Sequence, residues 1–332
     1  MGFLEKYTTG VGIDISEHHV RFAQVSLFGS INETLEIELP DGLIVDGRVE
    51  DLKKVQDIVG KKFAKSKLKG ANLNAVLLLP ESRVFSNSFI LPRALRGNNV
   101  LVESQKIAQK NIPIPFTRSK VAVSQGDTEA GGKRTTLYAI DSKIASDFQE
   151  IFKVTPLNVI ALEANSKSIL RLIDHFHSKD LFQKGTEQLH VVVDIGHSWA
   201  SISVYTQKGS SLFSRAISYK HIAVTSEEKV LLPKVVADSI IEAIGEIMVY
   251  FEQHEQKITY IFLSGVEALD EKLNKELSKI STKEVPILNL GKAIKVGNLN
   301  EQKLHTFGAA VGAALRAVYP RRYAYQHNLL TK

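Results

Sequence analysis

Two short segments of the sequence carry residue types that could bind a phosphorylated ligand. Gly12-Ile-Asp-Ile-Ser16 and Val193-Asp-Ile-Gly196 each end an apolar run with an aspartate, Asp14 or Asp194, that is soon followed by a small residue. A tight turn directs consecutive backbone N–H groups at phosphate oxygens, and a small residue lets them approach. An aspartate at each strand end can hold hydrated Mg²⁺, which keeps most of its waters and takes few protein ligands.

These two segments open similar stretches of chain. Each aspartate is followed by a short turn, a strand candidate and a glycine, and the spacings Asp14 to Gly29 and Asp194 to Gly209 are both 15 residues. Such a repeat indicates two related lobes, each with an acidic strand end. An aspartate also begins ordinary hairpin turns, but the matched pair favours a duplicated phosphate-binding hairpin.

Composition limits the class of protein. The chain has 332 residues, which is more than one compact core usually needs, and 44% of them are hydrophobic and 23% charged. The absence of cysteine excludes disulfides, thiolate zinc sites, iron–sulfur clusters and cysteine nucleophiles. No apolar stretch approaches the ~20 residues needed to cross a bilayer, and no apolar signal core follows Met1. We therefore expect a cytoplasmic protein.

Apolar runs typical of strands alternate with helical periodicity, which predicts an α/β fold. The clearest helices are expected after Asp51, over 236–251 and over 305–319, and the last is rich in glycine and alanine, so it can approach another backbone closely. The strand candidates are Val11–Ser16, Val20–Leu27, Thr34–Leu39, Ala75–Leu79, Val84–Leu91, Lys120–Ser124, Thr135–Ile140, Leu157–Leu162, Leu189–Ile195, Ser201–Tyr205, Leu212–Ser218, Tyr260–Leu263 and Val285–Leu288.

Six stretches, in order along the chain, resemble the PilM family of type IV pilus assembly proteins, which belongs to the actin-like (FtsA/PilM) superfamily. Two are similar to its phosphate motifs and one to its adenosine motif, and three sharpen the match from the superfamily to PilM. In that order they are Gly12–Val25, His190–Val204 and Ile261–Leu269, then Leu39–Val49, Asn111–Phe116 and Phe307–Arg316.

The resemblance implies an α/β, actin-like (ribonuclease H-like) duplicated two-lobe fold with an inserted small subdomain and a truncated fourth subdomain. The implied bounds are 1–80 and 157–187 for the first lobe, 81–156 for the insert, 188–218 and 233–319 for the second lobe, 219–232 for the remnant of the subdomain flanking the nucleotide, and 320–332 for a basic C-terminal tail.

The resemblance also implies a role and partners. It implies a scaffold at the inner face of the cytoplasmic membrane that binds the N-terminal cytoplasmic peptide of the membrane protein PilN, in a groove between the first lobe and the insert. It further implies membership of the inner-membrane pilus assembly complex and association between copies. No specific nucleic-acid partner is expected, because the lysines over 61–69 lack interleaved aromatic residues and are typical of a solvated face.

For ATP with Mg²⁺, the resemblance implies a set of cofactor-binding residues and no catalytic residue. Asp14 and Asp194 would hold the metal through water. The set consists of Asp14, Ser16, Arg21, Asp194, Gly196, Ser198, Ser264 and Gly265.

Several positions depart from the family where nucleotide binding is most sensitive. His197 and Trp199 stand where small residues and threonine are usual, and Val266 and Glu267 replace glycines. The Cβ atoms of Val266 and Glu267 would crowd a purine or ribose. We therefore expect a degenerate or weak ATP cleft without hydrolysis. The alternative is an active Mg-ATP-binding ATPase or a small kinase of the same fold; a secretion-system subunit is disfavoured because no membrane span follows Tyr319.

The end of the chain suggests a contact with the same groove. Asn328-Leu329-Leu330 resembles the Asn-Leu-Leu core of the PilN peptide. One hypothesis is that the tail occupies its own groove or that of a neighbouring copy, in competition with PilN. The other is a frayed terminus, since three residues match easily by chance.

Overall fold

The computed structural model describes residues 9–68, 73–129, 132–176, 188–206, 209–219, 228–280, 285–297, 299–323 and 326–330. The chain forms two compact units. The first comprises Met1–Leu172, Val296–Asn298 and Ala309–Lys332, and the second comprises Ile173–Lys295 and Leu299–Gly308. None of the helices in these described ranges is both long and apolar enough to cross a membrane.

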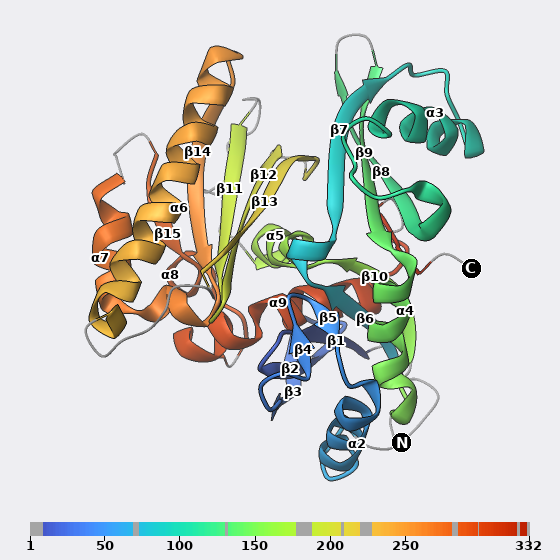
Figure 1. Ribbon diagram of the computed structural model, residues 1–332, viewed down its shortest axis with the longest axis vertical. Coiled ribbons are helices and arrows are strands. Elements are labelled where there is room, and N and C mark those ends of the chain that lie inside the picture. Colours follow the sequence, from blue (N-terminus) through green and yellow to red (C-terminus); the bar gives the residue numbers. More distant parts are fainter. Residues whose placement is uncertain are drawn as a thin grey trace. The chain divides into compact units, whose positions relative to one another are not determined.

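A five-stranded mixed sheet forms the centre of the first unit, in the order β10-β6-β1-β2-β3 (Figure 1). Strands β1, β2 and β3 form an antiparallel meander, whereas β6 and β10 run parallel to β1. Parallel strands buried on both faces read as continuous apolar runs, and β6, Asn-Ala-Val-Leu-Leu-Leu, is such a run. The strands are β1 (Thr9–Ile15), β2 (His19–Ser26), β3 (Ile31–Glu38), β6 (Asn74–Leu79) and β10 (Asn158–Ala164).

Helices α2 and α9 are among those that pack against this sheet. Helix α2 (Leu52–Phe63) begins after Asp51, whose side chain accepts a hydrogen bond from the Lys54 amide at 3.0 Å, as expected for an N-cap. Helix α9 (Glu301–Val318) approaches β1 so closely that a Cβ on Gly12 would overlap the carbonyl oxygen of Ala310. The prediction that the glycine-rich last helix allows close backbone approach is therefore confirmed.

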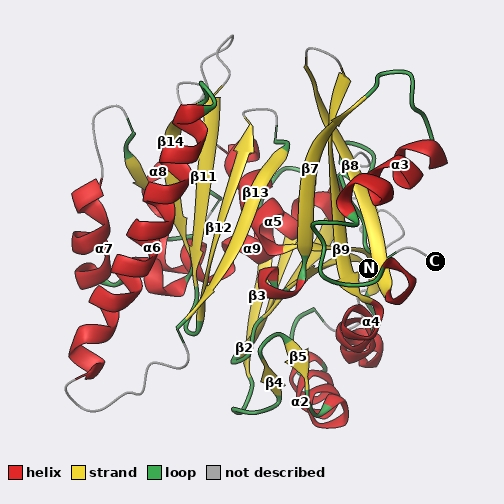
Figure 2. Ribbon diagram, turned by 45° about the horizontal axis from the view of Figure 1, so that its top comes forward, coloured by secondary structure: helices red, strands yellow, loops and turns green. Residues whose placement is uncertain are grey.

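A three-stranded antiparallel sheet with order β7-β9-β8 makes up the insert, and α3 covers one of its faces (Figure 2). Its own small core includes Ala108, Ile112 and Leu137, with the half-buried Phe116 packed against it. The insert elements are β7 (Phe85–Leu91), α3 (Asn98–Ala108), β8 (Ser119–Glu129) and β9 (Gly132–Asp141); the short hairpin β4 (Ile44–Val45) and β5 (Arg48–Val49) precedes them. Helix α4 (Ser142–Ile151) follows β9 and buries Phe148 and Ile151 in the core of the first sheet.

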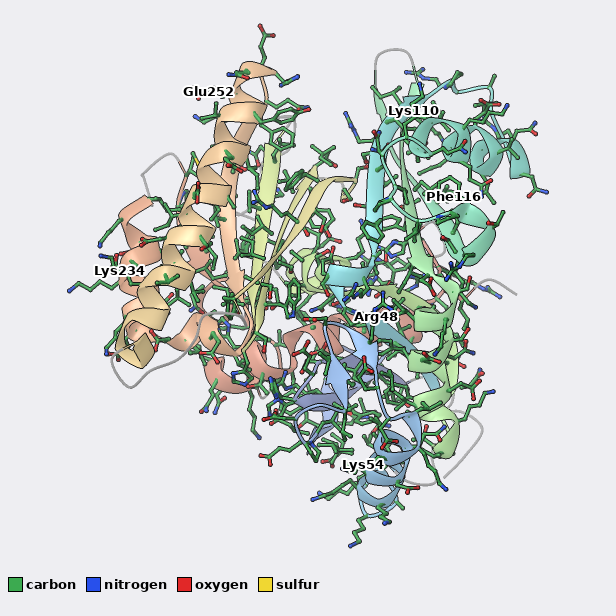
Figure 3. The ribbon with its side chains drawn as sticks, viewed as in Figure 1. Arg48, Lys54, Lys110, Phe116, Lys234 and Glu252 are labelled. Carbon is green, nitrogen blue, oxygen red and sulfur yellow. The ribbon has the colours of Figure 1, made fainter. Side chains whose placement is uncertain are left out.

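The second unit contains another five-stranded sheet, in the order β13-β12-β11-β14-β15. Helix α6 packs its apolar side on this sheet, and Lys234 and Glu252 lie on its exposed side (Figure 3). The elements are β11 (Gln188–Ile195), β12 (Trp199–Thr206), β13 (Ser211–Ser218), α6 (Glu228–Gln253), β14 (Lys257–Ser264), α7 (Glu271–Leu277), β15 (Ile287–Asn289) and α8 (Leu290–Ala293); α5 (Asn165–Phe176) precedes them.

The repeat predicted from the spacing of Asp14 and Asp194 is confirmed. Both sheets consist of an antiparallel meander followed by two parallel strands, so β1, β2, β3, β6 and β10 correspond to β11, β12, β13, β14 and β15. The glycine that ends each spacing, Gly29 or Gly209, has a positive φ of 75° or 86°. Its N–H closes the turn on the carbonyl oxygen of Ser26 or Thr206. Such turns favour glycine because a Cβ is strained there.

The structure bears on two of the expected domain bounds. Helix α6 begins at Glu228, so part of the expected remnant 219–232 is helical, while 220–227 lie outside the described residues. The chain from Ala309 onward packs with the first unit, although the sequence places residues up to 319 in the second lobe. The remaining bounds stay a prediction.

Candidate functional site

The end of the β1–β2 hairpin brings together three of the expected site residues. Asp14 lies directly opposite Arg21 on the neighbouring strand, with Arg21 Nη1 at 3.9 Å from Asp14 Oδ2. The Arg21 Nε donates to Glu36 Oε1 at 2.8 Å, so one guanidinium is shared by two carboxylates. Burial raises the pKa of Asp14 above its usual value, the Arg21 charge opposes this shift, and the Glu36 charge adds to it.

Ser16 forms the turn of this hairpin. Its N–H donates to the carbonyl oxygen of His19 at 2.8 Å, and its hydroxyl accepts from the His19 N–H at 3.2 Å. The Ser16 side chain therefore stabilises the turn itself. A role of Ser16 and Arg21 in phosphate binding stays a prediction.

The β11–β12 hairpin repeats this geometry in the second unit. Asp194 lies opposite Ser201, and the N–H of Gly196 donates to the carbonyl oxygen of Trp199 at 2.9 Å, as Ser16 does to His19. Asp194 is also the register partner of Ser264 at the end of the parallel strand β14. The carboxyl ends of β11 and β14 therefore bring the second group of expected site residues to one edge of the sheet.

Tyr219 packs on the loop of this second hairpin. Its hydroxyl donates to the carbonyl oxygen of Gly196, and its N–H donates to the carbonyl oxygen of Ser198 at 3.2 Å. Burial raises the pKa of Tyr219 far above its usual value, and the nearby carboxylates of Glu267 and Asp194 raise it further. The phenol thus stays protonated and can donate to the loop at any physiological pH.

The loop after β14 is joined to the same hairpin. Gly265 has a φ of 93°, and a Cβ there would overlap the backbone of Ile195, so this position requires glycine. Glu267, in the following turn, contacts His197 of the hairpin loop, with its Oε1 beside His197 Nδ1. Ser264, the residue before the glycine, is buried. The second-unit site therefore consists of two loops that are held by their own side chains.

Sequence reasoning missed two contacts of this site. The sequence places Tyr219 only in the expected remnant 219–232, and it shows His197 and Glu267 only as departures from the family, with no sign that they contact each other. Among the described residues, no group of three or more histidine, cysteine, aspartate or glutamate side chains is placed to hold a metal ion.

Residues 328–330 pack against the first unit. The side-chain amide of Asn328 bonds to the backbone of β10 at Ile160 and Leu162, Leu329 is completely buried, and Leu330 packs against the same apolar core. A frayed end is therefore wrong for this segment, whereas residues 324, 325, 331 and 332 lie outside the described part of the chain.

Solved structures of known proteins share this fold. A chain of a PilM–PilN type IV pilus biogenesis complex matches with a TM-score of 0.68 and 15% identity, over 94% of this chain and 98% of that chain. Ethanolamine utilization protein EutJ from Carboxydothermus hydrogenoformans matches with a TM-score of 0.50 and 14% identity, over 92% of this chain and 89% of that chain. These likenesses show the actin-like fold.

Sequence comparison goes further than the fold. No curated protein sequence matches the chain significantly. The family model described as type IV pilus assembly protein PilM, however, matches residues 12–227, which include both aspartate hairpins and the insert. Because this match spans well over half of the 332 residues, the chain belongs to the PilM family of type IV pilus assembly proteins.

Proposed function

We propose that the chain is a scaffold of type IV pilus assembly that binds the N-terminal cytoplasmic peptide of PilN at the inner face of the cytoplasmic membrane. The observation that carries this proposal is the correspondence with the chain of the PilM–PilN complex, which covers 94% of this chain and 98% of that one. The family match over residues 12–227 supports the same assignment. A partner held at the membrane would place the chain in the inner-membrane assembly complex.

We further propose that the nucleotide site is degenerate. In the second hairpin, the Gly196 N–H is used by Trp199 and the Ser198 carbonyl by Tyr219, while His197 is paired with Glu267. A phosphate-binding turn needs N–H groups that are directed at the ligand, whereas the Gly196 N–H is already bonded within the hairpin. These contacts support the proposal that the groups of this loop bond to one another and do not bind the phosphates of a nucleotide.

The residues of the first hairpin also fit a bound Mg²⁺ ion poorly. Mg²⁺ bound through water needs carboxylates whose charge is available to it. The Asp14 carboxylate is already balanced by Arg21, and burial raises its pKa, which favours the protonated acid. The first hairpin therefore does not fit a water-bound Mg²⁺ ion.

Calorimetric titration with Mg-ATP, combined with a phosphate-release assay, tests the second proposal. The expected result is no saturable binding in the micromolar range and no turnover above background. An active ATPase or small kinase would instead bind ATP and release or transfer phosphate. That activity would count against the proposal if it disappeared in Asp14→Ala and Asp194→Ala variants that remain folded.

Fluorescence anisotropy with a labelled peptide of the first residues of PilN tests the first proposal. We expect saturable binding whose affinity is the same with and without Mg-ATP. A scrambled peptide of the same composition is the matched control. Equal affinity for both peptides would show that binding does not depend on the peptide sequence and would contradict the first proposal.

A further inference from the structure

The last described segment, Gln326–Leu330 (hereafter the C-terminal segment), lies along the edge of the first sheet. Among the described residues, strand β10 is at the end of the order β10-β6-β1-β2-β3, with β6 as its strand neighbour. On the other side, the Asn328 side-chain amide donates to the Ile160 carbonyl at 3.1 Å and accepts from the Leu162 N–H at 3.0 Å. The Leu329 N–H donates to the Leu162 carbonyl at 2.9 Å.

These bonds satisfy the outward-facing backbone groups of an edge strand. Residues 160, 162 and 164 alternate along β10, and the third of them, Ala164, donates its N–H to His327 Nε2 at 3.1 Å. Alternate residues of a strand direct their N–H and C=O groups to the same side. The C-terminal segment thus does what an added strand does, with the Asn328 amide in place of a peptide group.

Side chains of the segment reach both parts of the first unit. Leu329 is completely buried in the core that also contains Leu162 of β10 and Tyr138 of the insert strand β9. The His327 ring stacks on the Tyr138 ring, with centroids 3.6 Å apart. The surface that holds the segment, hereafter the tail site, therefore lies between the first sheet and the insert.

Two buried arginines complete the tail site by binding the segment's oxygen atoms. Arg316 Nη1 donates to the His327 carbonyl at 2.7 Å, and Arg171 Nε donates to Gln326 Oε1 at 3.1 Å. Both guanidiniums also bond to the carboxylate of Glu163, which is fully buried. Because a buried donor left without an acceptor destabilises the protein, any replacement for the segment has to supply oxygens at the same places.

We propose that the C-terminal segment is an internal occupant of a peptide-binding site, and that an extended peptide in trans binds the tail site only when the segment leaves. The fitting peptide has an amide side chain followed by a branched apolar residue, with its carbonyl oxygens facing Arg316. This inference rests on the proposed function, since it identifies that peptide as the one from PilN. The apparent affinity for the PilN peptide would then be the intrinsic affinity multiplied by the fraction of molecules in which the C-terminal segment has left the tail site.

Removal of the segment gives the direct test. The full chain is compared with a chain that ends at Tyr323, which keeps the buried Tyr323 ring and deletes residues 324–332. The probes are a fluorescein-labelled peptide of residues 320–332 and the labelled PilN peptide. We expect the shortened chain to bind both probes, and the full chain to bind each at least about tenfold more weakly, because the tethered segment is present at a high effective concentration.

A point variant keeps the test decisive if the shortened chain fails to fold. Asn328→Ala removes both side-chain bonds to β10, whereas Asn111→Ala changes an exposed asparagine and is the matched control. We expect Asn328→Ala to tighten binding of the PilN peptide about tenfold, the effect of weakening the internal competitor by about 1.4 kcal/mol, and Asn111→Ala to leave it unchanged.

The outcomes separate this inference from the proposed function. Equal affinity of the PilN peptide for the full chain, the shortened chain and Asn328→Ala would overturn the inference and keep the proposed function. Failure of the PilN peptide to bind any form, with binding of the 320–332 peptide to the shortened chain, would keep the tail site and overturn the proposed function. Failure of a folded shortened chain to bind the 320–332 peptide would also overturn the inference.

Discussion

His327 stacks on Tyr138 with an angle of 17° between the ring planes, while its Nε2 accepts the N–H of Ala164. One imidazole near the end of the chain thus contacts the insert and the edge of the first sheet at once. A ring nitrogen that accepts a hydrogen bond carries no proton, so the docked His327 is neutral. Burial lowers the pKa of His327 well below 6.5, and the charges of Arg316, Lys167 and Arg171 lower it further, although Glu163 opposes them.

Acidification should therefore weaken docking of the C-terminal segment. Below the ordinary histidine pKa of 6.5, the released or unfolded state binds a proton that the docked state does not, so stability falls as the pH drops. We expect the free energy of unfolding, measured by urea denaturation, to decrease between about pH 7.5 and pH 5. His327→Gln, whose amide oxygen can accept from Ala164 without titrating, should flatten this decrease.

The matched control for the histidine is His254→Gln, which changes an exposed ring at the end of α6. It should leave the pH dependence as it is in the parent chain. Equal slopes for the parent and His327→Gln would show that His327 is not the group that titrates.

The buried carboxylate of Glu163 should be one of the most sensitive positions in the first unit. It accepts from Arg171 at 2.7 Å and also from Arg316, and these charges hold its pKa at about 2 despite burial. Glu163→Gln leaves two buried guanidiniums without a counter-charge, so we expect a loss of about 3–5 kcal/mol in the free energy of unfolding. In the parent chain, this contribution is present above pH 4.5 and is lost as the pH falls toward about 2.

A surface pair provides the comparison for Glu163. Arg215 and Glu246 form an equally direct contact at 2.8 Å, but both side chains are about half exposed. Glu246→Gln should cost less than about 1 kcal/mol because solvent screens the pair. Similar losses for the two variants in thermal or urea denaturation would contradict the buried-pair argument.

Much of the fold could be predicted from the sequence because its signals are local. Each strand candidate coincides with an observed strand within a few residues, since alternating or continuous apolar runs depend on burial of near neighbours. The spacing from Asp14 to Gly29 and from Asp194 to Gly209 indicated the repeat because hairpin turns restrict residue types at fixed positions.

The contacts that hold the sites together could not be predicted in the same way. Glu163 lies 153 residues before Arg316, and their types alone give no sign that they meet in one buried cluster with His327. The same holds for Tyr219 and Gly196, which are joined by a hydroxyl-to-carbonyl bond. Long-range polar contacts follow from tertiary packing, and a single sequence carries no periodic signal for them.

The hydrogen bond from Tyr219 to the loop of the β11–β12 hairpin can be tested with a single substitution. Tyr219→Phe removes only the hydroxyl that donates to the Gly196 carbonyl. We expect a loss of about 1 kcal/mol, the usual net value of one hydrogen bond, and faster amide exchange in the loop from Gly196 to Trp199. Tyr250→Phe, at a ring that is 55% exposed, should change neither property. Unchanged exchange in Tyr219→Phe would mean that the hydroxyl does not hold the loop.

Alanine substitution should have opposite effects on stability at Gly12, where β1 packs closely on α9, and at Gly245. A Cβ at Gly12 would overlap the Ala310 carbonyl oxygen, which belongs to the backbone of α9 and cannot turn away. Gly12→Ala should therefore destabilise the first unit by about 3 kcal/mol or more through forced separation of strand and helix. Gly245 lies within α6 with open space around it, so Gly245→Ala should stabilise the protein by up to about 1 kcal/mol through helix propensity. Thermal denaturation of both variants measures the difference, and a tolerated alanine at position 12 would contradict the close approach of β1 and α9.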